Sequence, residues 1–291
     1  MKYLRNKTKL IAEIGCNHKG DMDIAIEMIE VASKYADIIK FQKRNNKELL
    51  TEEEFNKPHP VSYNSYGKTY GAHREFLEFD INQHKELKKE CEKRNTTYSC
   101  SAWDITSAED LIKMNLKIIK IPSACNLNKS LLSYIFENFK GEIHISMGMT
   151  TEEEIDKIFE LSKKKNRSKD TVFYACTSTY PANHNQLYLN EITKYIKKYG
   201  NDILSVGFSG HHSGIAPDIA AITLGASYIE RHFTLNRTWK GTDHAASLEP
   251  DGLRLLGRNM ASVESALIYK PSNLLKEESD QLEKLKTVNT L

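Results

Sequence analysis

The chain carries SVGFSGHH at residues 205–212 and YIERHF at residues 228–233, two short apolar stretches that each run into a histidine. Residues 217–225 between them have the composition of a helix. A helix that joins two parallel neighbouring strands leaves both strand ends on one edge of the sheet. We therefore expect His211 and His232 to meet there, where two imidazoles could hold a divalent metal ion. The alternative is that each histidine is satisfied by local hydrogen bonds.

The same alternation runs along the rest of the chain. Predicted strands lie at 10–15, 38–42, 97–100, 118–121, 143–147, 172–176, 205–212 and 228–233. The predicted helices that follow them lie at 22–35, 81–94, 106–114, 129–139, 151–165, 186–199, 217–225 and 250–266. Regular alternation predicts an α/β protein with a parallel sheet, and eight units in about 260 residues predict a closed (β/α)₈ TIM barrel. The alternative is an open doubly wound sheet, but no glycine-rich loop follows the first strand as a dinucleotide-binding version requires.

The predicted barrel extends over residues 1–270, with one inserted segment near 44–80 and a tail at 271–291 that could form a helix. The insertion interrupts the alternation with prolines, glycines and aromatic residues. Long structured insertions usually cover a site, so we expect residues 55–75 to act as a lid over the barrel mouth.

Composition excludes several classes of function. The chain has 291 residues, 40% hydrophobic and 27% charged residues and a net charge of +2, which are ordinary values for a globular protein and give no electrostatic reason to bind nucleic acid or a membrane surface. No apolar run reaches membrane-spanning length, and the first residues contain no apolar signal core. Five cysteines without a CxxC pair suggest reduced thiols, so we expect a cytoplasmic protein.

Polar residues gather where the predicted strands end, which is where barrels of this kind carry their active sites. They are Glu13, Lys40, Gln42, Ser101, Lys120, Ser123, Ser146, Ser178, Tyr180, Ser209, His211 and His232. Lys40 and Lys120 end apolar strands, and buried lysines next to hydroxyl groups indicate a phosphate or carboxylate pocket. The alternative for each lysine is a side chain that extends along the surface to water.

The sequence allows two roles for each of two acidic residues, Glu230 and Asp243. Glu230 lies two residues before His232 and faces the same side of the strand, so it could orient a ligand or pair with a lysine. Asp243 could face the site or close a turn in its loop. Four cysteines near strand ends could form a thiolate metal cluster, but they fit better as small apolar filler in a packed barrel. These are Cys16, Cys100, Cys125 and Cys176.

These residues resemble the sialic acid synthases (N-acetylneuraminate synthases), which condense phosphoenolpyruvate with an aldose to give a nonulosonic acid and phosphate. The matching stretches follow the family's order over almost the whole chain. They are AEIG at 12–15 with Asn17 and His18, KFQK at 40–43, GKTYGAHR at 67–74, CTSTYP at 176–181, Gly210 with His211, ERHFT at 230–234, TWKGTDH at 238–244 and ASLEP at 246–250.

The resemblance implies a role for each candidate residue. It implies that His211 and His232 hold a divalent metal, Mn²⁺ or Mg²⁺, and that Glu13 lies beside the enolpyruvate. It implies phosphoenolpyruvate binding by Lys40, Ser101, Lys120, Ser123, Ser146, Ser178 and Ser209, with Gln42 among the substrate-binding residues. It implies that Tyr180 and Asp243 contact the acceptor, which is N-acetylmannosamine, its 6-phosphate or a related amino sugar.

The chain departs from the family's pattern in two places. Cys125 stands where the family has an acidic residue that helps to hold the amino sugar, and the family's C-terminal antifreeze-like domain is absent from the sequence. In the family that domain gives an arginine to the partner subunit's sugar site, so we do not expect the swapped dimer that depends on it, and a homodimer through the barrel faces remains possible. Two other functions stay open: a Schiff-base aldolase acting through Lys40 or Lys120, and a non-catalytic barrel that binds a sugar or phosphoenolpyruvate.

Overall fold

Eight parallel strands close into a barrel. The computed structural model describes residues 8–287, so the parts of the predicted barrel and tail that fall on residues 1–7 and 288–291 lie outside the described residues. The strands pair in chain order from β1 to β8, and β8 pairs with β1. They are β1 Lys9–Gly15, β2 Ile38–Lys43, β3 Thr97–Ala102, β4 Ile118–Ile121, β5 Glu142–Ser146, β6 Thr171–Cys176, β7 Ser205–Gly210 and β8 Tyr228–His232. The predicted (β/α)₈ barrel is confirmed.

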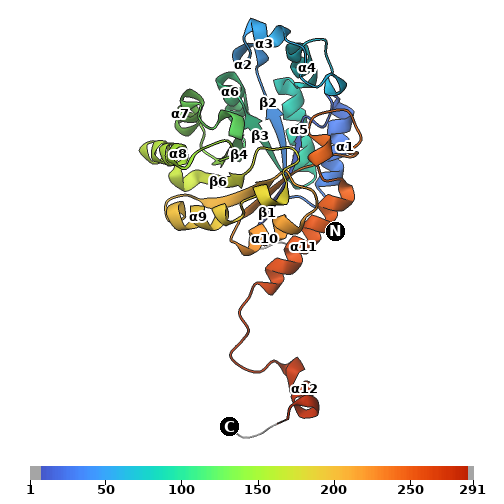
Figure 1. Cartoon of the computed structure of the whole chain (residues 1–291), viewed down its shortest axis with the longest axis vertical. Coiled ribbons are helices and arrows are strands. Elements are labelled where there is room, and N and C mark those ends of the chain that lie inside the picture. The colour runs from blue at the N-terminus through green and yellow to red at the C-terminus, as the bar shows by residue number, and fades with distance from the viewer. Residues whose placement is uncertain (1–7, 288–291) are drawn as a thin grey trace.

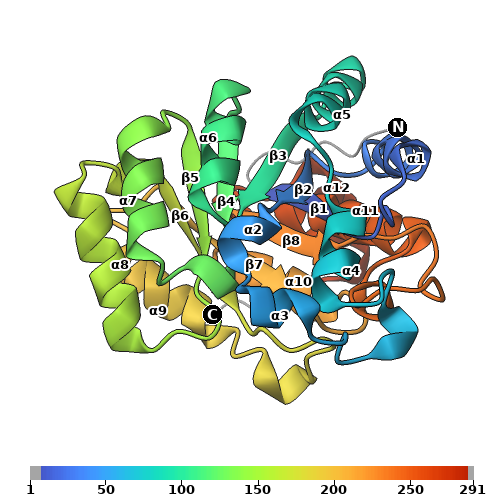
Figure 2. The same ribbon diagram turned by 90° about the horizontal axis from the view of Figure 1, so that it is seen from above.

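A helix follows each strand, and the helices surround the barrel (Figure 2). They are α1 Met22–Ala32, α5 Ile81–Lys93, α6 Ile105–Lys113, α7 Lys129–Asn138, α8 Glu152–Lys164, α9 Asn190–Tyr199, α10 Ala216–Thr223 and α11 Pro250–Ala266. The main difference from the predicted bounds is the start of α9, expected at residue 186. His184–Gln186 forms a 3₁₀ turn, and Tyr188 has a φ of 46°, a left-handed conformation that a continuous helix does not allow.

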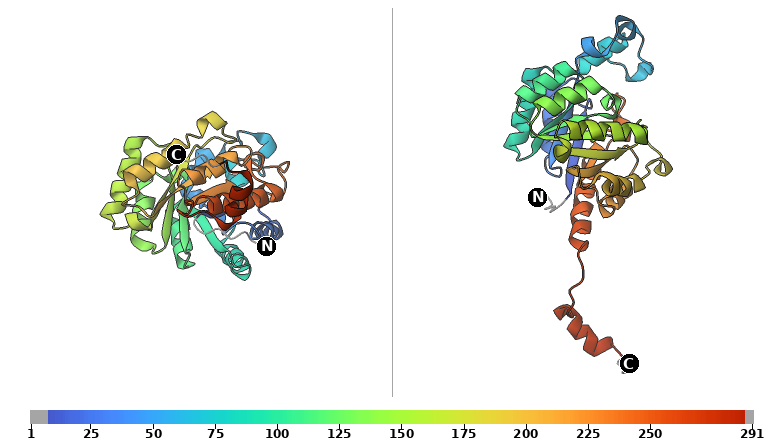
Figure 3. Two further views of the ribbon diagram at one scale, coloured as in Figure 1. Left: turned by 90° about the horizontal axis from the view of Figure 1, so that it is seen from below. Right: turned by 90° about the vertical axis from the view of Figure 1, so that its left-hand side faces the viewer.

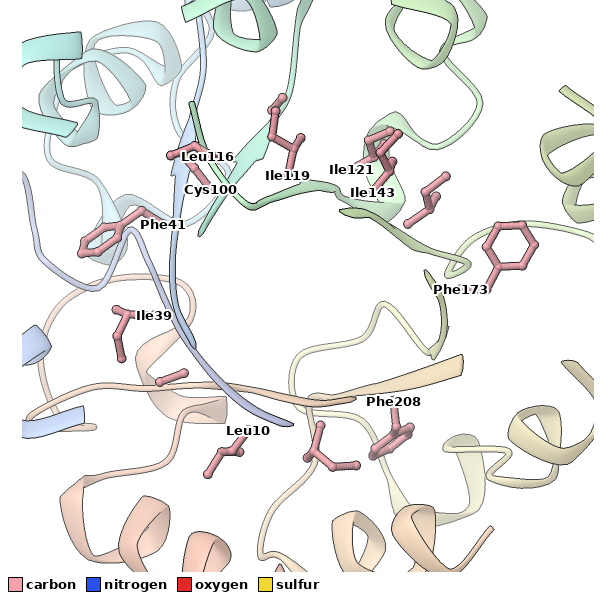
Figure 4. Packing of buried hydrophobic residues seen from close by; sticks show 14 of the residues in the cluster. Leu10, Ile39, Phe41, Cys100, Leu116, Ile119, Ile121, Ile143, Phe173 and Phe208 are labelled. Carbon is pink, nitrogen blue, oxygen red and sulfur yellow. The ribbon is translucent and has the colours of Figure 1, made fainter. Parts of the chain in front are cut away.

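Side chains alternate between the two faces of each strand. The outward faces are apolar, and Leu10, Phe41 and Phe208 point from the strands toward the helices (Figure 4), where all three are fully buried. The inward faces differ along the barrel axis. A small apolar cluster that includes Ile11 and Val172 fills the part near the strand starts, while charged and hydroxyl side chains occupy the carboxyl ends. The packed lower layer therefore supports a polar upper layer.

The insertion after β2 folds into three short helices, α2 Asn46–Leu49, α3 Glu52–Asn56 and α4 Tyr70–Leu77, and a 3₁₀ turn, η1 Ser62–Asn64. These helices project from the end of the molecule opposite its C-terminus (Figure 1). Tyr66 stacks on Phe76, with ring centroids 5.1 Å apart, and its hydroxyl donates to the carbonyl oxygen of Lys240 in the loop after β8. The insertion is thus hydrogen-bonded to the loop that follows β8. Its role as a lid stays a prediction.

The tail contains one helix, α12 Lys276–Leu285, which lies apart from the barrel at the end of an extended segment (Figures 1 and 3). None of its residues is buried. Within residues 8–287, no helix combines the length and the apolar composition needed to cross a membrane.

The buried side chains on the outward faces of the strands should contribute strongly to the free energy of unfolding. We expect Phe41→Ala to lower the free energy of unfolding by about 3–5 kcal/mol, because it leaves a cavity between β2 and the helices. Tyr269→Ala removes a fully exposed ring and should change the free energy by less than about 0.5 kcal/mol. Urea unfolding measures both values, and equal effects would contradict this assignment of the core.

Candidate active site

The carboxyl ends of the strands surround a cavity of about 240 Å³. Twelve of the thirteen predicted site residues line it, and they come from all eight strands or the loops that follow them. These are Glu13, Lys40, Gln42, Ser101, Lys120, Ser123, Ser146, Ser178, Tyr180, Ser209, His211 and His232. Alternation along each strand explains the convergence, since residues two apart, such as Lys40 and Gln42, share the inward face.

Two lysines and two glutamates form the floor of the cavity. The Lys40 ammonium lies 2.5 Å from Glu13 and 3.6 Å from Glu230, and the Lys120 ammonium lies 3.0 Å from Glu230. Both lysine side chains are at most 4% exposed. The predicted surface-directed alternative is therefore excluded for both lysines. For Glu230, the predicted pairing with a lysine is the arrangement that the structure contains.

The pKa values of the charged groups at the floor are shifted in different directions. Burial alone would raise the pKa of Glu230, but the ammonium groups of Lys120 and Lys40 hold it well below its usual value. Burial would lower the pKa of Lys40, but Glu13 and Glu230 outweigh that effect and raise it. Burial lowers the pKa of Lys120, because Glu230 only partly offsets it and the charge of Lys40 adds to it. Glu230 is consequently an ionised partner shared by two cations.

Hydroxyl groups lie along the wall above this floor. Ser101 accepts a hydrogen bond from the Lys40 ammonium at 3.0 Å, and Ser209 donates to Glu230 at 3.3 Å. Gly148 leaves space for two more, since a Cβ there would lie 2.3 Å from the Ser178 Oγ and 2.7 Å from the Ser123 Oγ. Cations surrounded by hydroxyl donors can bind a small molecule that carries several negative charges.

His211 and His232 also line the cavity, with ring centroids 5.6 Å apart. The Nδ1 of His211 lies 2.9 Å from the carbonyl oxygen of Thr177, so it carries the proton and leaves Nε2 free to coordinate. Burial and the neighbouring His232 lower the pKa of His211 to about 3, which keeps this imidazole neutral. The Nδ1 of His232 is buried without a hydrogen-bond partner. These properties fit a pair of metal ligands.

Within residues 8–287, the histidine pair lacks a third side chain placed to bind the same ion. Among the described residues, no group of three or more His, Cys, Asp or Glu side chains is arranged to hold a metal ion. The cysteine metal cluster considered from the sequence is likewise not formed, and all five cysteines are free. An ion at the pair would complete its coordination with water or substrate oxygens, as open catalytic sites do.

Gln42 links Glu13 to Arg44 by hydrogen bonds. Its Nε2 donates to Glu13 at 2.7 Å, and its Oε1 accepts from Arg44 at 2.5 Å. The Arg44 guanidinium lies 3.7 Å from the centroid of the Trp103 ring. Gly15 leaves room for Gln42 to reach Glu13. It has a φ of +57°, and a Cβ there would lie 3.0 Å from the Gln42 amide.

Comparison with known proteins agrees with this geometry. Residues 28–271, well over half of the chain, match the model of the NeuB family. The chain belongs to the NeuB family. The human N-acetylneuraminate-9-phosphate synthase is 37% identical over 277 residues, which cover 95% of this chain and 76% of that protein. The Campylobacter jejuni N,N'-diacetyllegionaminic acid synthase is 34% identical over 263 residues, 90% of this chain and 78% of that protein.

The fold of this NeuB-family chain also matches a solved relative. The crystal structure of the sialic acid synthetase of Leptospira borgpetersenii in complex with citrate superposes with a TM-score of 0.80 at 27% identity. The superposition covers 96% of this chain and 91% of that one. The resemblance inferred from the sequence motifs is confirmed.

Asp243 is the one predicted site residue of this NeuB-family chain that does not line the cavity. It precedes the 3₁₀ turn η5 His244–Ala246, and its Oδ1 accepts a hydrogen bond from the Thr242 hydroxyl at 3.0 Å. Burial would raise its pKa, but His232 and this hydrogen bond hold the pKa below its usual value. The Asp243 carbonyl oxygen accepts a hydrogen bond from the Ala246 amide at 3.2 Å, so Asp243 closes a turn, and its carboxylate lies close enough to His232 for the charge of His232 to lower its pKa.

Several lining residues were not predicted. Trp103 directly follows β3 and Met149 lies in the loop after β5, so position after a strand end was the signal that could have found them. Pro122, Ala124 and Cys176 also line the cavity. Cys125 is buried beside it, and its thiol donates to the carbonyl oxygen of Trp103 at 3.3 Å.

We expect Glu230→Gln to lower the free energy of unfolding by about 3–5 kcal/mol, because it removes the carboxylate shared by two buried ammonium groups. Because its pKa is lowered, Glu230 stabilises the protein fully above the unfolded-state value of about 4.3 and loses this effect as the pH falls toward the folded value. The variant should therefore lose less stability than the wild type on acidification. Urea unfolding at neutral and acidic pH tests both points, and Glu153→Gln, at an exposed pair with Lys157, is the matched control.

Proposed function

We propose that this protein condenses phosphoenolpyruvate with an N-acylated hexosamine to give a sialic-acid-like nonulosonic acid and inorganic phosphate. The observation that carries the proposal is the convergence of two buried lysines, a set of hydroxyls and a histidine pair on one cavity. The names of the relatives support it, since they are synthases of N-acetylneuraminate 9-phosphate and of diacetyllegionaminic acid.

The lysine side of the cavity suits the anionic substrate. Phosphoenolpyruvate carries a carboxylate and a phosphate, and Lys40 and Lys120 would share their charge between these groups and the glutamates of the floor. Ser101, Ser123, Ser146, Ser178 and Ser209 would hold the phosphate and carboxylate oxygens by hydrogen bonds. Glu13 would lie beside the enolpyruvate, held in place by Lys40 and Gln42. Rigid strands fix these groups, which orients C3 of the enol toward the acceptor.

The histidine side suits the aldehyde of the open-chain sugar. A divalent ion at His211 and His232, Mn²⁺ or Mg²⁺, would polarise this carbonyl as a Lewis acid. C3 of the enolpyruvate forms the new bond to the aldehyde carbon, whose oxygen is protonated. Water adds at C2 with loss of a proton, and phosphate leaves with cleavage of its bond to C2. Tyr180, whose ring centroid lies 4.1 Å from that of His211, would contact the sugar together with Gln42 and Asp243.

We infer a cytoplasmic enzyme, in keeping with its free cysteines, and a homodimer through the barrel faces. The acceptor is an N-acylated hexosamine, such as N-acetylmannosamine, its 6-phosphate or a related amino sugar. Residues 55–75 would cover this acceptor when it is bound.

Phosphate release tests the reaction directly. We expect phosphate release from phosphoenolpyruvate only when Mn²⁺ or Mg²⁺ and a suitable hexosamine or hexosamine 6-phosphate are both present, and chelation should stop it. Absence of release with every acceptor in the panel would contradict the proposal. Borohydride treatment with pyruvate should leave the protein unlabelled, because a Schiff-base aldolase alone would form a reducible adduct on Lys40 or Lys120.

The histidine pair makes a second prediction. His211→Ala should reduce turnover by about 100-fold or more, since it removes one of two ligands to the proposed ion, and it should also weaken Mn²⁺ binding measured by calorimetry. His184→Ala is the control, because His184 is an exposed histidine in the 3₁₀ turn before α9. Full activity of His211→Ala with unchanged Mn²⁺ binding would exclude the metal role.

A further inference from the structure

A tyrosine supports one of the two floor lysines from below. The Lys120 ammonium lies 3.5 Å from the centroid of the Tyr174 ring, on the side of the barrel interior away from the cavity. Tyr174 is fully buried and belongs to the apolar cluster that fills the lower barrel. The Lys120 ammonium thus contacts an aromatic face as well as the Glu230 carboxylate, which lies 3.0 Å away.

A chain of hydrogen bonds holds this ring in place. The Tyr174 hydroxyl lies 2.8 Å from Nδ1 of His144, and Nε2 of His144 lies 3.2 Å from Glu142. Glu142 also accepts a hydrogen bond from Tyr228 at 2.8 Å. A carboxylate can only accept, so His144 donates from Nε2, and its Nδ1 accepts the proton of Tyr174. The hydrogen bond from His144 also lowers the pKa of Glu142, which keeps that carboxylate ionised.

The neighbouring strand leaves the space that the ring needs. Gly207 on β7 pairs with Tyr174 on β6, and a Cβ at Gly207 would lie 2.6 Å from Cε1 of the ring. The contact is therefore built from three strands: β6 supplies the ring, β5 supplies His144 and Glu142, and β7 supplies a residue without a side chain.

We propose that Tyr174 is a positioning residue for Lys120, fixed in place by His144 and Glu142, and that it keeps the Lys120 ammonium aimed at the anionic substrate. This inference rests on the proposed function and concerns the same cavity. An aromatic face attracts a cation through its quadrupole without neutralising the charge. A second carboxylate at this position, in addition to Glu230, would compete further with the substrate for Lys120, whereas the ring attracts the ammonium without adding a negative charge.

The experiment compares three variants by steady-state kinetics with phosphoenolpyruvate and the acceptor that the panel identifies. Tyr174→Leu removes the ring, and we expect the KM for phosphoenolpyruvate to rise by about 5- to 30-fold while the KM for the acceptor stays within about twofold. Tyr174→Phe keeps the aromatic face and should restore most of the loss. Phe173→Leu is the matched control, because it makes the same kind of change at a buried aromatic on the same strand that packs against Tyr199 outside the barrel.

The outcomes separate this inference from the proposed function. An active wild type together with an unchanged phosphoenolpyruvate KM in Tyr174→Leu would overturn the positioning role alone. Equal effects of Tyr174→Leu and Phe173→Leu on both substrates would also overturn it, since they would indicate only a loss of packing. If Tyr174→Leu does not fold, Gly207→Ala decides: the added methyl displaces the ring, and an unchanged phosphoenolpyruvate KM would refute the proposal. A wild type that releases no phosphate with any acceptor would overturn the function and the inference together.

Discussion

The charge cluster at the barrel floor is the constraint on which the site depends. Burying an ammonium or a carboxylate alone is too costly to persist, so each of the four charged groups must lie against a partner. Glu230 meets this requirement for two lysines at once, and Glu13 meets it for one. The partners come from β1, β2, β4 and β8, so the cluster forms only when the barrel is closed and its strands are in register.

A balanced floor also determines how the cavity can bind an anion. With two cations and two carboxylates, it has no excess positive charge to attract a ligand. Binding must therefore come from charge-assisted hydrogen bonds to the individual lysines and from hydrogen bonds to the serines. This requirement explains the close approach of hydroxyls around Gly148 and the hydrogen bond that orients Ser101 toward Lys40. An anion that matches several of these donors gains far more than one that matches a single lysine.

The sequence was sufficient to predict those features that repeat along the chain. Alternating apolar stretches predicted eight strands and eight helices, and the position after each strand predicted twelve of the lining residues, because a parallel barrel brings all carboxyl ends together. The partner of Glu230 was left open between a ligand and a lysine, since sequence order does not say which inward side chains touch across the barrel. The contact between Lys120 and Tyr174 was missed for the same reason: it joins β4 to β6 and depends on the space at Gly207.

Loops were harder to predict than strands, and this difference has a functional consequence. Groups that would bind phosphoenolpyruvate lie largely on strands, whose register and alternation fix them, whereas Tyr180, Asp243 and Cys125 lie on the segments that follow strands. Such segments tolerate substitution because they carry less of the core packing. One barrel can therefore keep the condensation chemistry on its strands while its loops adapt to different sugars. The relatives' names differ in the sugar product, which is the kind of variation that such loops would allow, and Cys125 lies buried beside the cavity.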